Sequence, residues 1–325
     1  MRHILIISSI FLFSFTVISC SSKSDGGSST TSTTTDDNTT TTDNTTTTDN
    51  TTTTDNTTTS SSDNSSSSVS VLFVGVGASG NIVRSNDNGA SWDNATSPTG
   101  NDFRGVGFGN NTFVAVGNNG NIVRSTDNGS TWDNVTSPTT TNLSKVTFGN
   151  NTFLAVGNNG NIVRSTDNGS SFDNATSPTA IHLNGVTFGN NTFVGVDVSG
   201  NIVRSTDNGS SFDNATNSNA SMLLGVTFGN NTFVGVGYSG NIVRSTDNGS
   251  SWDNATSPTD THLYGVTFGN NTFVAVGLSG NIVRSTDNGS SFDNATNSNT
   301  TSLLRVTFGN NTFVAVGLSG NIVRS

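Results

Sequence analysis

The chain has 325 residues, with 22 acidic against 12 basic residues and a formal charge of −10, and every acid is an aspartate. It contains 36 glycines and is rich in serine, threonine and asparagine, residues that favour turns over helices, so we expect an all-β protein. The acidic balance argues against a nucleic-acid partner, because phosphate binding needs clustered lysine and arginine. The single cysteine, Cys20, excludes an intrachain disulfide and a cysteine-based metal cluster.

The first 20 residues are typical of a secretion signal. Arg2 and His3 precede an apolar run from Ile4 to Ile18, which is too short for a stable membrane span. The run closes with Val-Ile-Ser-Cys, which resembles the lipobox of bacterial lipoproteins. That resemblance implies a lipid on Cys20, which would become the new N-terminus and the membrane anchor of a protein at the bacterial cell envelope, in the outer membrane or at the cell surface. The alternative is an ordinary signal with a chance cysteine.

Residues 21–68 form a low-complexity segment in which "TTTTDN" occurs three times between Thr39 and Asn56. It has almost no apolar side chain to bury, so we expect a disordered stalk. A flexible coil of this length spans roughly 40 Å on average. The stalk would therefore hold the rest of the chain away from a membrane surface.

From residue 69 onward one unit is copied repeatedly. "GNIVRS" begins at Gly80 and returns every 40 residues up to Gly320. A fixed period near 40 is typical of helical repeat pairs or of four-stranded propeller blades, and the composition excludes helices. Short sheets of this kind bury both faces only against each other, so we predict a β-propeller of four-stranded antiparallel blades over residues 69–325.

Each unit contains four predicted strands separated by turn residues. In one copy they are Leu143 to Phe148, Thr152 to Gly157, Asn161 to Ser165 and Ser171 to Thr176. Their apolar or alternating residues and the bounding Gly, Asn and Asp are typical of short antiparallel strands.

The number of blades follows from the incomplete units at the two ends. Five units are complete, and they begin at Phe103, Leu143, Leu183, Leu223 and Leu263. The first unit, Val71 to Thr96, lacks strand one, and the last, Leu303 to Ser325, lacks strand four. We favour seven blades, two of them incomplete; six blades closed by the N-terminal fourth strand are the alternative.

The turn after the third strand carries the pattern Ser-x-Asp-x-Gly-x-x-Trp/Phe, which occurs six times. It resembles the Asp-box, or bacterial neuraminidase repeat, of sialidases, sortilin-type receptors and photosystem II assembly-factor-like propellers, and the wider unit is most similar to the last of these. The six aspartates are Asp87, Asp127, Asp167, Asp207, Asp247 and Asp287.

Residue types within the Asp-box predict a structural role. Asn128-Gly129 supplies the positive φ angles of a tight hairpin, Asp127 and Ser125 can hydrogen-bond the turn, and Trp132 packs into the blade. The spacing does not fit an EF-hand, which needs five oxygen-bearing positions and a terminal glutamate. Six weak calcium sites are the alternative; we predict no metal site and no cofactor.

An arginine recurs on the third strand. Its copies are Arg84, Arg124, Arg164, Arg204, Arg244, Arg284 and Arg324. A half-buried arginine needs an acceptor, and we expect either an inter-strand ion pair, with Asp133 and its copies as partners, or a hydrogen bond to the backbone.

The sialidase resemblance implies an arginine triad, a tyrosine nucleophile paired with glutamate, and an acidic aspartate. This chain has no glutamate, and its only tyrosines are Tyr238 and Tyr264. We therefore predict no catalytic residues; a Ser-His-Asp set has no supporting pattern.

Differences between the repeats concentrate in two connections, from strand four to the next strand one and from strand two to strand three. In an up-and-down blade both emerge on one face, and binding residues favour loops on a rigid scaffold. Drift where packing constrains least is the alternative. The candidate binding residues on this face are Arg104, Lys145, His182, Met222, Tyr238, His262, Tyr264 and Arg305.

These observations favour a monomeric, non-catalytic binding propeller displayed at the cell envelope, with a protein or a glycan as its partner. A glycan-processing enzyme of sialidase type is one alternative. A chaperone for an envelope complex, implied only by the assembly-factor resemblance, is the other. Fold alone does not name the ligand.

Overall fold

The computed structural model describes residues 16–20, 72–87, 89–217, 221–297, 300–309 and 311–325. These residues belong to one compact unit. The predicted stalk, 21–68, and most of the predicted signal, 1–15, lie outside the described residues. Within the described part of the chain, no helix is both long and apolar enough to span a membrane.

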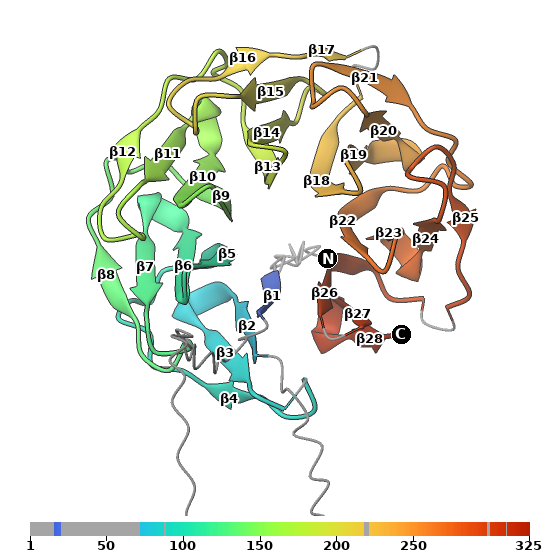
Figure 1. Cartoon of the computed structure of the whole chain (residues 1–325). Coiled ribbons are helices and arrows are strands. Elements are labelled where there is room, and N and C mark those ends of the chain that lie inside the picture. The colour runs from blue at the N-terminus through green and yellow to red at the C-terminus, as the bar shows by residue number, and fades with distance from the viewer. Residues whose placement is uncertain (1–15, 21–71, 88, 218–220, 298–299, 310) are drawn as a thin grey trace, which may run out of the picture. The chain divides into compact units, whose positions relative to one another are not determined.

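Seven small, mainly antiparallel sheets form a ring, which confirms the predicted propeller and its seven blades (Figure 1). The blades follow one another in chain order. Within each blade the first strand is the innermost, and the later strands lie progressively farther from the centre of the ring. The innermost strands are β1 (Thr16–Cys20), β5 (Phe103–Gly109), β9 (Leu143–Gly149), β13 (Leu183–Gly189), β18 (Leu223–Gly229), β22 (Leu263–Gly269) and β26 (Leu303–Gly309). The second strands are β2 (Leu72–Val76), β6 (Thr112–Gly117), β10 (Thr152–Gly157), β14 (Thr192–Asp197), β19 (Thr232–Gly237), β23 (Thr272–Gly277) and β27 (Thr312–Gly317).

The outer half of each blade is built from shorter strands. The third strands are β3 (Ile82–Ser85), β7 (Ile122–Ser125), β11 (Ile162–Ser165), β15 (Ile202–Ser205), β20 (Ile242–Ser245), β24 (Ile282–Ser285) and β28 (Ile322–Arg324). The fourth strands are β4 (Asp93–Asn94), β8 (Asp133–Val135), β12 (Asp173–Asn174), β16 (Asp213–Asn214), β21 (Ser251–Asn254) and β25 (Asp293–Asn294). Most fourth strands are therefore shorter than predicted, and blade seven has three strands.

Two kinds of tight turn have the predicted backbone geometry. Asn150 and Asn151, between the first and second strands, have φ angles of 48° and 58°, the left-handed pair that a two-residue hairpin needs. Asn128 and Gly129 in the Asp-box have φ angles of 60° and 76°. Between strands two and three most blades have a single turn of 3-10 helix: η1 (Ala78–Gly80), η2 (Asn118–Gly120), η3 (Asn158–Gly160), η4 (Tyr238–Gly240), η5 (Leu278–Gly280) and η6 (Leu318–Gly320).

The hydrophobic core lies between neighbouring blades. One cluster joins Leu154 and Ile162 of blade three to Leu183, Phe193 and Phe212 of blade four, and all five are buried. Equivalent clusters repeat between the other neighbouring blades. Each sheet therefore hides its apolar faces against the adjoining sheets, as the repeat architecture requires.

Backbone hydrogen bonds also join neighbouring blades at the outer rim. The segment after a fourth strand runs parallel to the end of the next Asp-box, as in the bridge between Thr176 and Ser211. The segment after β16 of blade four is a short strand, β17 (Thr216–Asn217). It joins the sheet of blade five, where it pairs in parallel with β21. These bonds limit the sliding of one blade over the next.

The first blade differs from the sequence-based expectation. Its innermost strand, predicted to be missing, is supplied by β1, which pairs antiparallel with β2. β1 lies between β26 and β5, so it completes the inner circle of strands (Figure 1). The last five residues of the predicted signal, Thr16–Cys20, thus have a structural position in this form of the chain, because β2 would otherwise present an unpaired inner edge.

Candidate binding site at the centre of the ring

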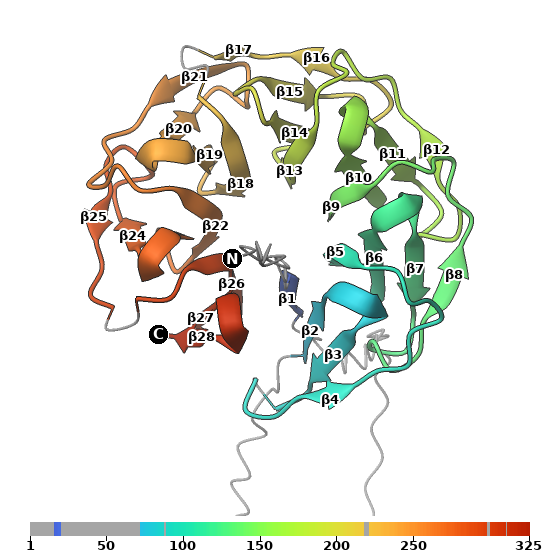
Figure 2. The same ribbon diagram turned by 180° about the vertical axis from the view of Figure 1, so that it is seen from behind.

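Both variable connections emerge on the same face, where the 3-10 turns lie (Figure 2). The residue before each inner strand links the two connections through hydrogen bonds. Asp102 accepts from the backbone N–H of Asn118 in its own blade at 2.9 Å, and its carboxylate accepts from the N–H of Ser79 in blade one at 2.8 Å. His262 makes the equivalent bond through Nδ1 to the N–H of Ser239 at 3.1 Å. The variable face is therefore held by contacts between blades.

A β-bulge interrupts the inner strands at their second residue. In β5 the register shifts between Phe103 and Gly105, so Arg104 has no direct partner across the ladder; β9, β13, β18, β22 and β26 shift at the same place. A bulge re-aims the side chain of the extra residue. The bulged residues all line one pocket, and they are Arg104, Ser144, Asn184, Leu224, Tyr264 and Leu304.

This pocket has a volume of about 600 Å³ and opens on the variable face. Blades two to four line it with polar side chains: Asp102, Arg104, Ser144, His182 and Asn184. Blades five to seven line it mainly with apolar side chains: Leu224, Tyr238, Tyr264, Leu278, Leu304 and Leu318. Among these, Tyr238 and Leu278 are 40% and 36% exposed. The pocket thus has a polar side and an apolar side, a lining typical of a site that binds and orients a ligand.

Hydrogen bonds position the polar side. Arg104 Nε donates to Asn118 Oδ1 at 2.6 Å, and Asn118 Nδ2 donates to Asp102 Oδ2 at 3.1 Å. The His182 Nε2 and the Ser144 hydroxyl are 2.8 Å apart. Burial lowers the pKa of the His182 imidazole, and the charge of Arg104 lowers it further. The polar side consequently combines a guanidinium that is hydrogen-bonded to Asn118 with an imidazole whose neutral form is favoured.

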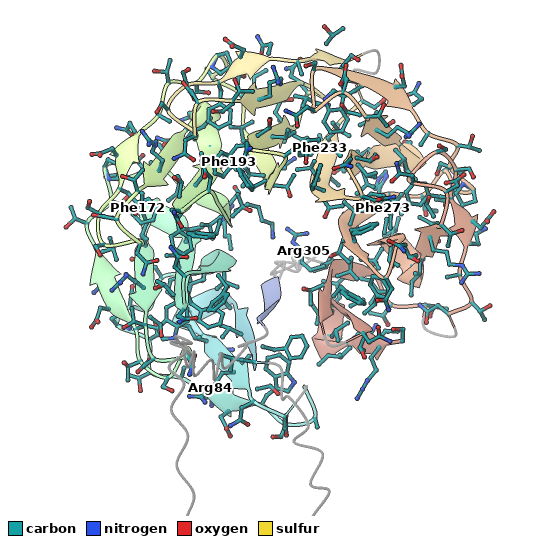
Figure 3. The ribbon with its side chains drawn as sticks, viewed as in Figure 1. Arg84, Phe172, Phe193, Phe233, Phe273 and Arg305 are labelled. Carbon is teal, nitrogen blue, oxygen red and sulfur yellow. The ribbon has the colours of Figure 1, made fainter. Side chains whose placement is uncertain are left out.

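Two more cations lie at the inner wall, which is notable in a chain of net charge −10. Arg305 is near the centre of the ring (Figure 3) and donates through one terminal nitrogen to the backbone oxygens of Leu304 and Tyr264, at 2.7 and 3.3 Å. Burial lowers the pKa of Arg305 to about 10. Burial, with repulsion from Arg305, lowers the pKa of Lys145 well below its ordinary value. Shifted pKa values of this kind are common at binding and catalytic sites.

An aromatic group borders the apolar side. The rings of Tyr238 and His262 stack with centroids 4.1 Å apart and an interplanar angle of 10°. Tyr264 meets His262 edge-on at 6.4 Å. Burial, and to a lesser extent Tyr238, raises the pKa of Tyr264. The group therefore presents apolar ring surface, and the Tyr264 hydroxyl stays protonated at neutral pH.

The structure brings together five of the eight candidate binding residues as pocket lining: Arg104, His182, Tyr238, Tyr264 and Arg305. The charge of Arg305 acts on Lys145, and His262 stacks on Tyr238. Met222 precedes β18, where its backbone oxygen accepts from Tyr238. Ser144, Leu224 and Leu304 were not predicted, although they vary at the same repeat position as Arg104 and Tyr264. That shared position was the signal available in the sequence.

The Asp-box turns lie away from this pocket and bind their own backbone. Ser125 donates to Asp127 Oδ1 at 2.8 Å, and Thr131 donates to the same carboxylate through its N–H, at 3.0 Å to Oδ1, and through its hydroxyl, at 2.6 Å to Oδ2. The Trp132 indole donates to the Gly129 carbonyl at 3.1 Å. This geometry fits the structural role that the sequence predicts.

These hydrogen bonds make the Asp-box sensitive to acid. Burial raises the pKa of Asp127, but the bonds from Thr131, Ser125 and Ser130 outweigh it and lower the pKa from 3.8 to about 2. The pKa of Asp247 is also lowered. A pKa of about 2 is shared by four other Asp-box aspartates: Asp87, Asp167, Asp207 and Asp287.

We expect the melting temperature to fall as the pH drops from about 4 to 2. A carboxylate whose pKa is lower in the folded chain stabilises the fold above its unfolded pKa, and this stabilisation is lost as pH falls through the folded pKa. Differential scanning calorimetry at several pH values measures the effect. Asp127→Asn should reduce the difference between pH 5 and pH 2.5, and an unchanged difference would contradict this role.

The recurrent arginines of the third strand contact the next blade. Arg124 Nε donates to the Asn168 carbonyl at 2.8 Å, Arg164 donates to the Ser210 hydroxyl at 2.9 Å, and Arg84 donates to the Ser130 hydroxyl. Asp133 is opposite Arg124 in the ladder, but the hydrogen bond that Arg124 makes is to the backbone. Of the two expected partners, the backbone is the one observed for Arg124.

No group of three or more metal-ligating His, Cys or Asp side chains is found among the described residues. The oxygen atoms of the Asp-box are engaged by hydroxyl and N–H donors of the same turn. The calcium alternative therefore finds no support in the arrangement of these donors.

Comparison with known proteins gives one family and several solved structures. The family model described as "Photosynthesis system II assembly factor YCF48" matches residues 74–325. No curated protein sequence matches the chain. The structure "YCF48 bound to D1 peptide" is 17% identical with a TM-score of 0.65, over 78% of this chain and 87% of that chain.

Two further structures show the same fold. YCF48 from Cyanidioschyzon merolae is 16% identical with a TM-score of 0.62, over 78% of this chain and 90% of that chain. The computationally designed Ika8 protein is 12% identical with a TM-score of 0.61, over 78% of this chain and 80% of that chain. At these identities the likeness shows the fold alone.

Proposed function

Because the chain belongs to the photosystem II assembly factor YCF48 family, we propose that it is a non-catalytic propeller that binds a peptide segment of a partner protein. The observation that carries the proposal is the two-sided central pocket. Its volume of about 600 Å³ suits a few side chains of a peptide better than a folded surface. The solved relative that is bound to a D1 peptide supports a peptide as the class of ligand.

Because one side of the pocket is polar and the other apolar, a bound peptide would be held in one orientation. An apolar or aromatic side chain fits against Leu224, Tyr264 and Leu304, where burial supplies the affinity. Polar groups of the same peptide fit against Arg104 and Asn184, where unpaired partners would be costly and so set specificity. Bulged positions on rigid inner strands hold these side chains in place before binding, which reduces the entropy cost of association.

The proposal also includes display of the propeller at the bacterial cell envelope. Lipidation of Cys20 would anchor the chain, and the stalk of residues 21–68 would let the propeller reach partners away from the bilayer. Mass spectrometry of the N-terminal peptide from the envelope fraction tests this part: an unmodified Cys20 with the signal still attached would contradict it.

The test of the pocket uses a library of 15-residue peptides screened against the full chain. We expect Tyr264→Ala combined with Leu304→Ala to weaken the selected peptides at least tenfold, because both side chains line the apolar side of the pocket. Ile322→Ala is the matched control, since Ile322 is apolar and 56% exposed but lies outside this pocket. Fluorescence anisotropy measures both affinities.

Three outcomes of the same experiment would contradict the proposal. Peptides that bind the double variant as well as the unaltered chain would place the site elsewhere. Binding on a glycan array without any peptide selected would favour a glycan ligand. Turnover of a fluorogenic sialoside would favour the sialidase alternative, for which the chain lacks the glutamate.

A further inference from the structure

We propose that the innermost position of blade one is an acceptor site for an extended peptide of the pattern Val-x-Phe-Gly, which replaces β1. The observations are independent of the central pocket. They concern the ladder between β1 and β2 and its comparison with the other six blades. The mode of binding would be β-strand addition, in which main-chain bonds give affinity and alternate side chains give specificity.

β1 is attached to its blade differently from the other inner strands. The inner strands β5, β9, β13, β18 and β22 continue into the second strand through a two-residue asparagine turn, such as Asn150-Asn151. Cys20 and Leu72, by contrast, are paired in the ladder although they are 52 positions apart in the chain. Closing a longer connection costs more conformational entropy, so β1 is held less firmly than a strand of a hairpin.

The register shows which residues an inner strand needs. In blade two, Val106 is opposite Ala115, Phe108 is opposite Phe113 and Gly109 is opposite Thr112. The same three residue types recur at these levels in all six copies from β5 to β26. An inner strand of this ring thus carries the pattern Val-x-Phe-Gly.

Of the three positions in this pattern, β1 has the matching residue type at only one. Val17, opposite Gly75, takes the valine level. Ser19, opposite Phe73, takes the phenylalanine level, and Cys20, opposite Leu72, takes the glycine level. Thr16–Cys20 is therefore a poor match for the position it occupies.

The phenylalanine level matters because it supplies a ring pair. Phe148 and Phe153 have ring centroids 4.7 Å apart, and the other five complete pairs lie between 4.5 and 4.7 Å. Phe73 contacts Trp92 at 6.3 Å, as Phe113 contacts Trp132 at 6.2 Å, but the residue opposite Phe73 on the inner strand is Ser19 and not a phenylalanine. A phenylalanine in the place of Ser19 would restore the missing pair, which contributes beyond its buried area.

The glycine level matters because the next blade leaves no room. A Cβ atom at Gly149 would lie 2.0 Å from the Phe188 ring, and Gly109 and Gly189 are covered by Phe148 and Phe228 in the same way. The position of Cys20 in the ladder corresponds to that of these glycines, and Phe108 of blade two corresponds to the rings that cover them. A strand with glycine there would fit without displacing that ring.

The seam beside this position is apolar, as an inner strand requires. Phe73 of blade one and Val316 of blade seven share a cluster. In the equivalent seam between blades one and two, Val106 and Phe108 pack with Val74 and Val76. The valine and phenylalanine of the incoming peptide would pack there, against Val316. The six strands of this pattern among the described residues already lie inside blades, and the occupant that we propose is a Val-x-Phe-Gly segment of a partner protein.

Removal of Thr16–Ser19 by processing ahead of Cys20 would empty the position. β2 would then present an unpaired inner edge in the mature chain, which is the template for strand addition. The leader strand acts in this scheme as a temporary occupant that is replaced by a partner.

The test uses the full chain and a labelled peptide of sequence HLYGVTFGN, taken from residues 262–270. Ile18→Pro weakens β1, because proline cannot donate to the ladder. We expect this variant to bind the peptide at least tenfold more tightly than the unaltered chain. A peptide with serine for its phenylalanine should bind at least tenfold more weakly than the original. Tyr264→Ala should leave both affinities unchanged, which separates this site from the pocket.

Hydrogen exchange gives a second readout. The amides of Leu72–Val76 should lose protection in Ile18→Pro and regain it when the peptide is added. If Ile18→Pro does not fold, Ile18→Gly weakens the same strand while keeping its N–H. Equal affinity for the two peptides, or no binding to a folded variant, would overturn the proposal.

Discussion

Replacing Phe193 by alanine is expected to lower the free energy of unfolding by about 3–5 kcal/mol. Phe193 is fully buried between blades three and four, and its ring lies 4.7 Å from that of Phe188 (Figure 3). Alanine would remove the ring from a cluster that contains Leu154 and Leu183 and would leave a cavity. Rigid sheets on both sides limit how far the site can collapse, so the loss should be near the upper end. Urea denaturation followed by tryptophan fluorescence measures it.

Phe313→Ala is the matched control for this prediction. Phe313 holds the same repeat position in blade seven, but it is only partly buried because that blade has three strands. Its replacement should cost clearly less than that of Phe193. Equal losses at the two sites would show that burial between complete blades is not what makes this phenylalanine important.

Gly149→Ala is expected to destabilise the chain by about 1–3 kcal/mol, although alanine adds a single methyl group. The new Cβ would lie 2.0, 2.1 and 2.5 Å from three atoms of the Phe188 ring. That ring is packed against Phe193, so it can move away only by disturbing a second ring. Urea denaturation again measures the loss.

Gly100→Ala provides the comparison for the glycine prediction. A Cβ at Gly100 meets nothing within 4 Å, and its φ angle is outside the left-handed region. Alanine there should be neutral or stabilising by up to about 1 kcal/mol, since it restricts the unfolded chain. Destabilisation of the same size at both positions would mean that contact with Phe188 is not the cause.

Local features of the fold were predictable because each depends on a few neighbouring residues. The Asn-Asn and Asn-Gly turns follow from the left-handed φ angles that these residues adopt. The hydrogen bonds of the Asp-box could be anticipated because, among the described residues, the partners of Asp127 lie within four positions of it in the sequence. The 40-residue period then required sheets that cover each other.

The candidate site was only partly predictable. Variation marked the face on which the pocket opens, but the bulge that turns Ser144, Leu224 and Leu304 into the pocket is a feature of the ladder, not of the residue types. His262 varies like a binding residue, yet it bonds Ser239 of the preceding blade and stacks on Tyr238. Sequence variation alone does not separate contacts between blades from contacts with a ligand.

The sequence by itself determined the repeat, the turns and the all-β class, because short-range backbone preferences and apolar alternation act within one unit of 40 residues. Only the tertiary structure decided what depends on meetings between distant units. It decided that seven sheets close the ring, that Arg124 bonds the next blade, and that β1 completes blade one. Such contacts join residues far apart in the chain, and near-identical copies give no sequence signal for which copies meet at the closing seam.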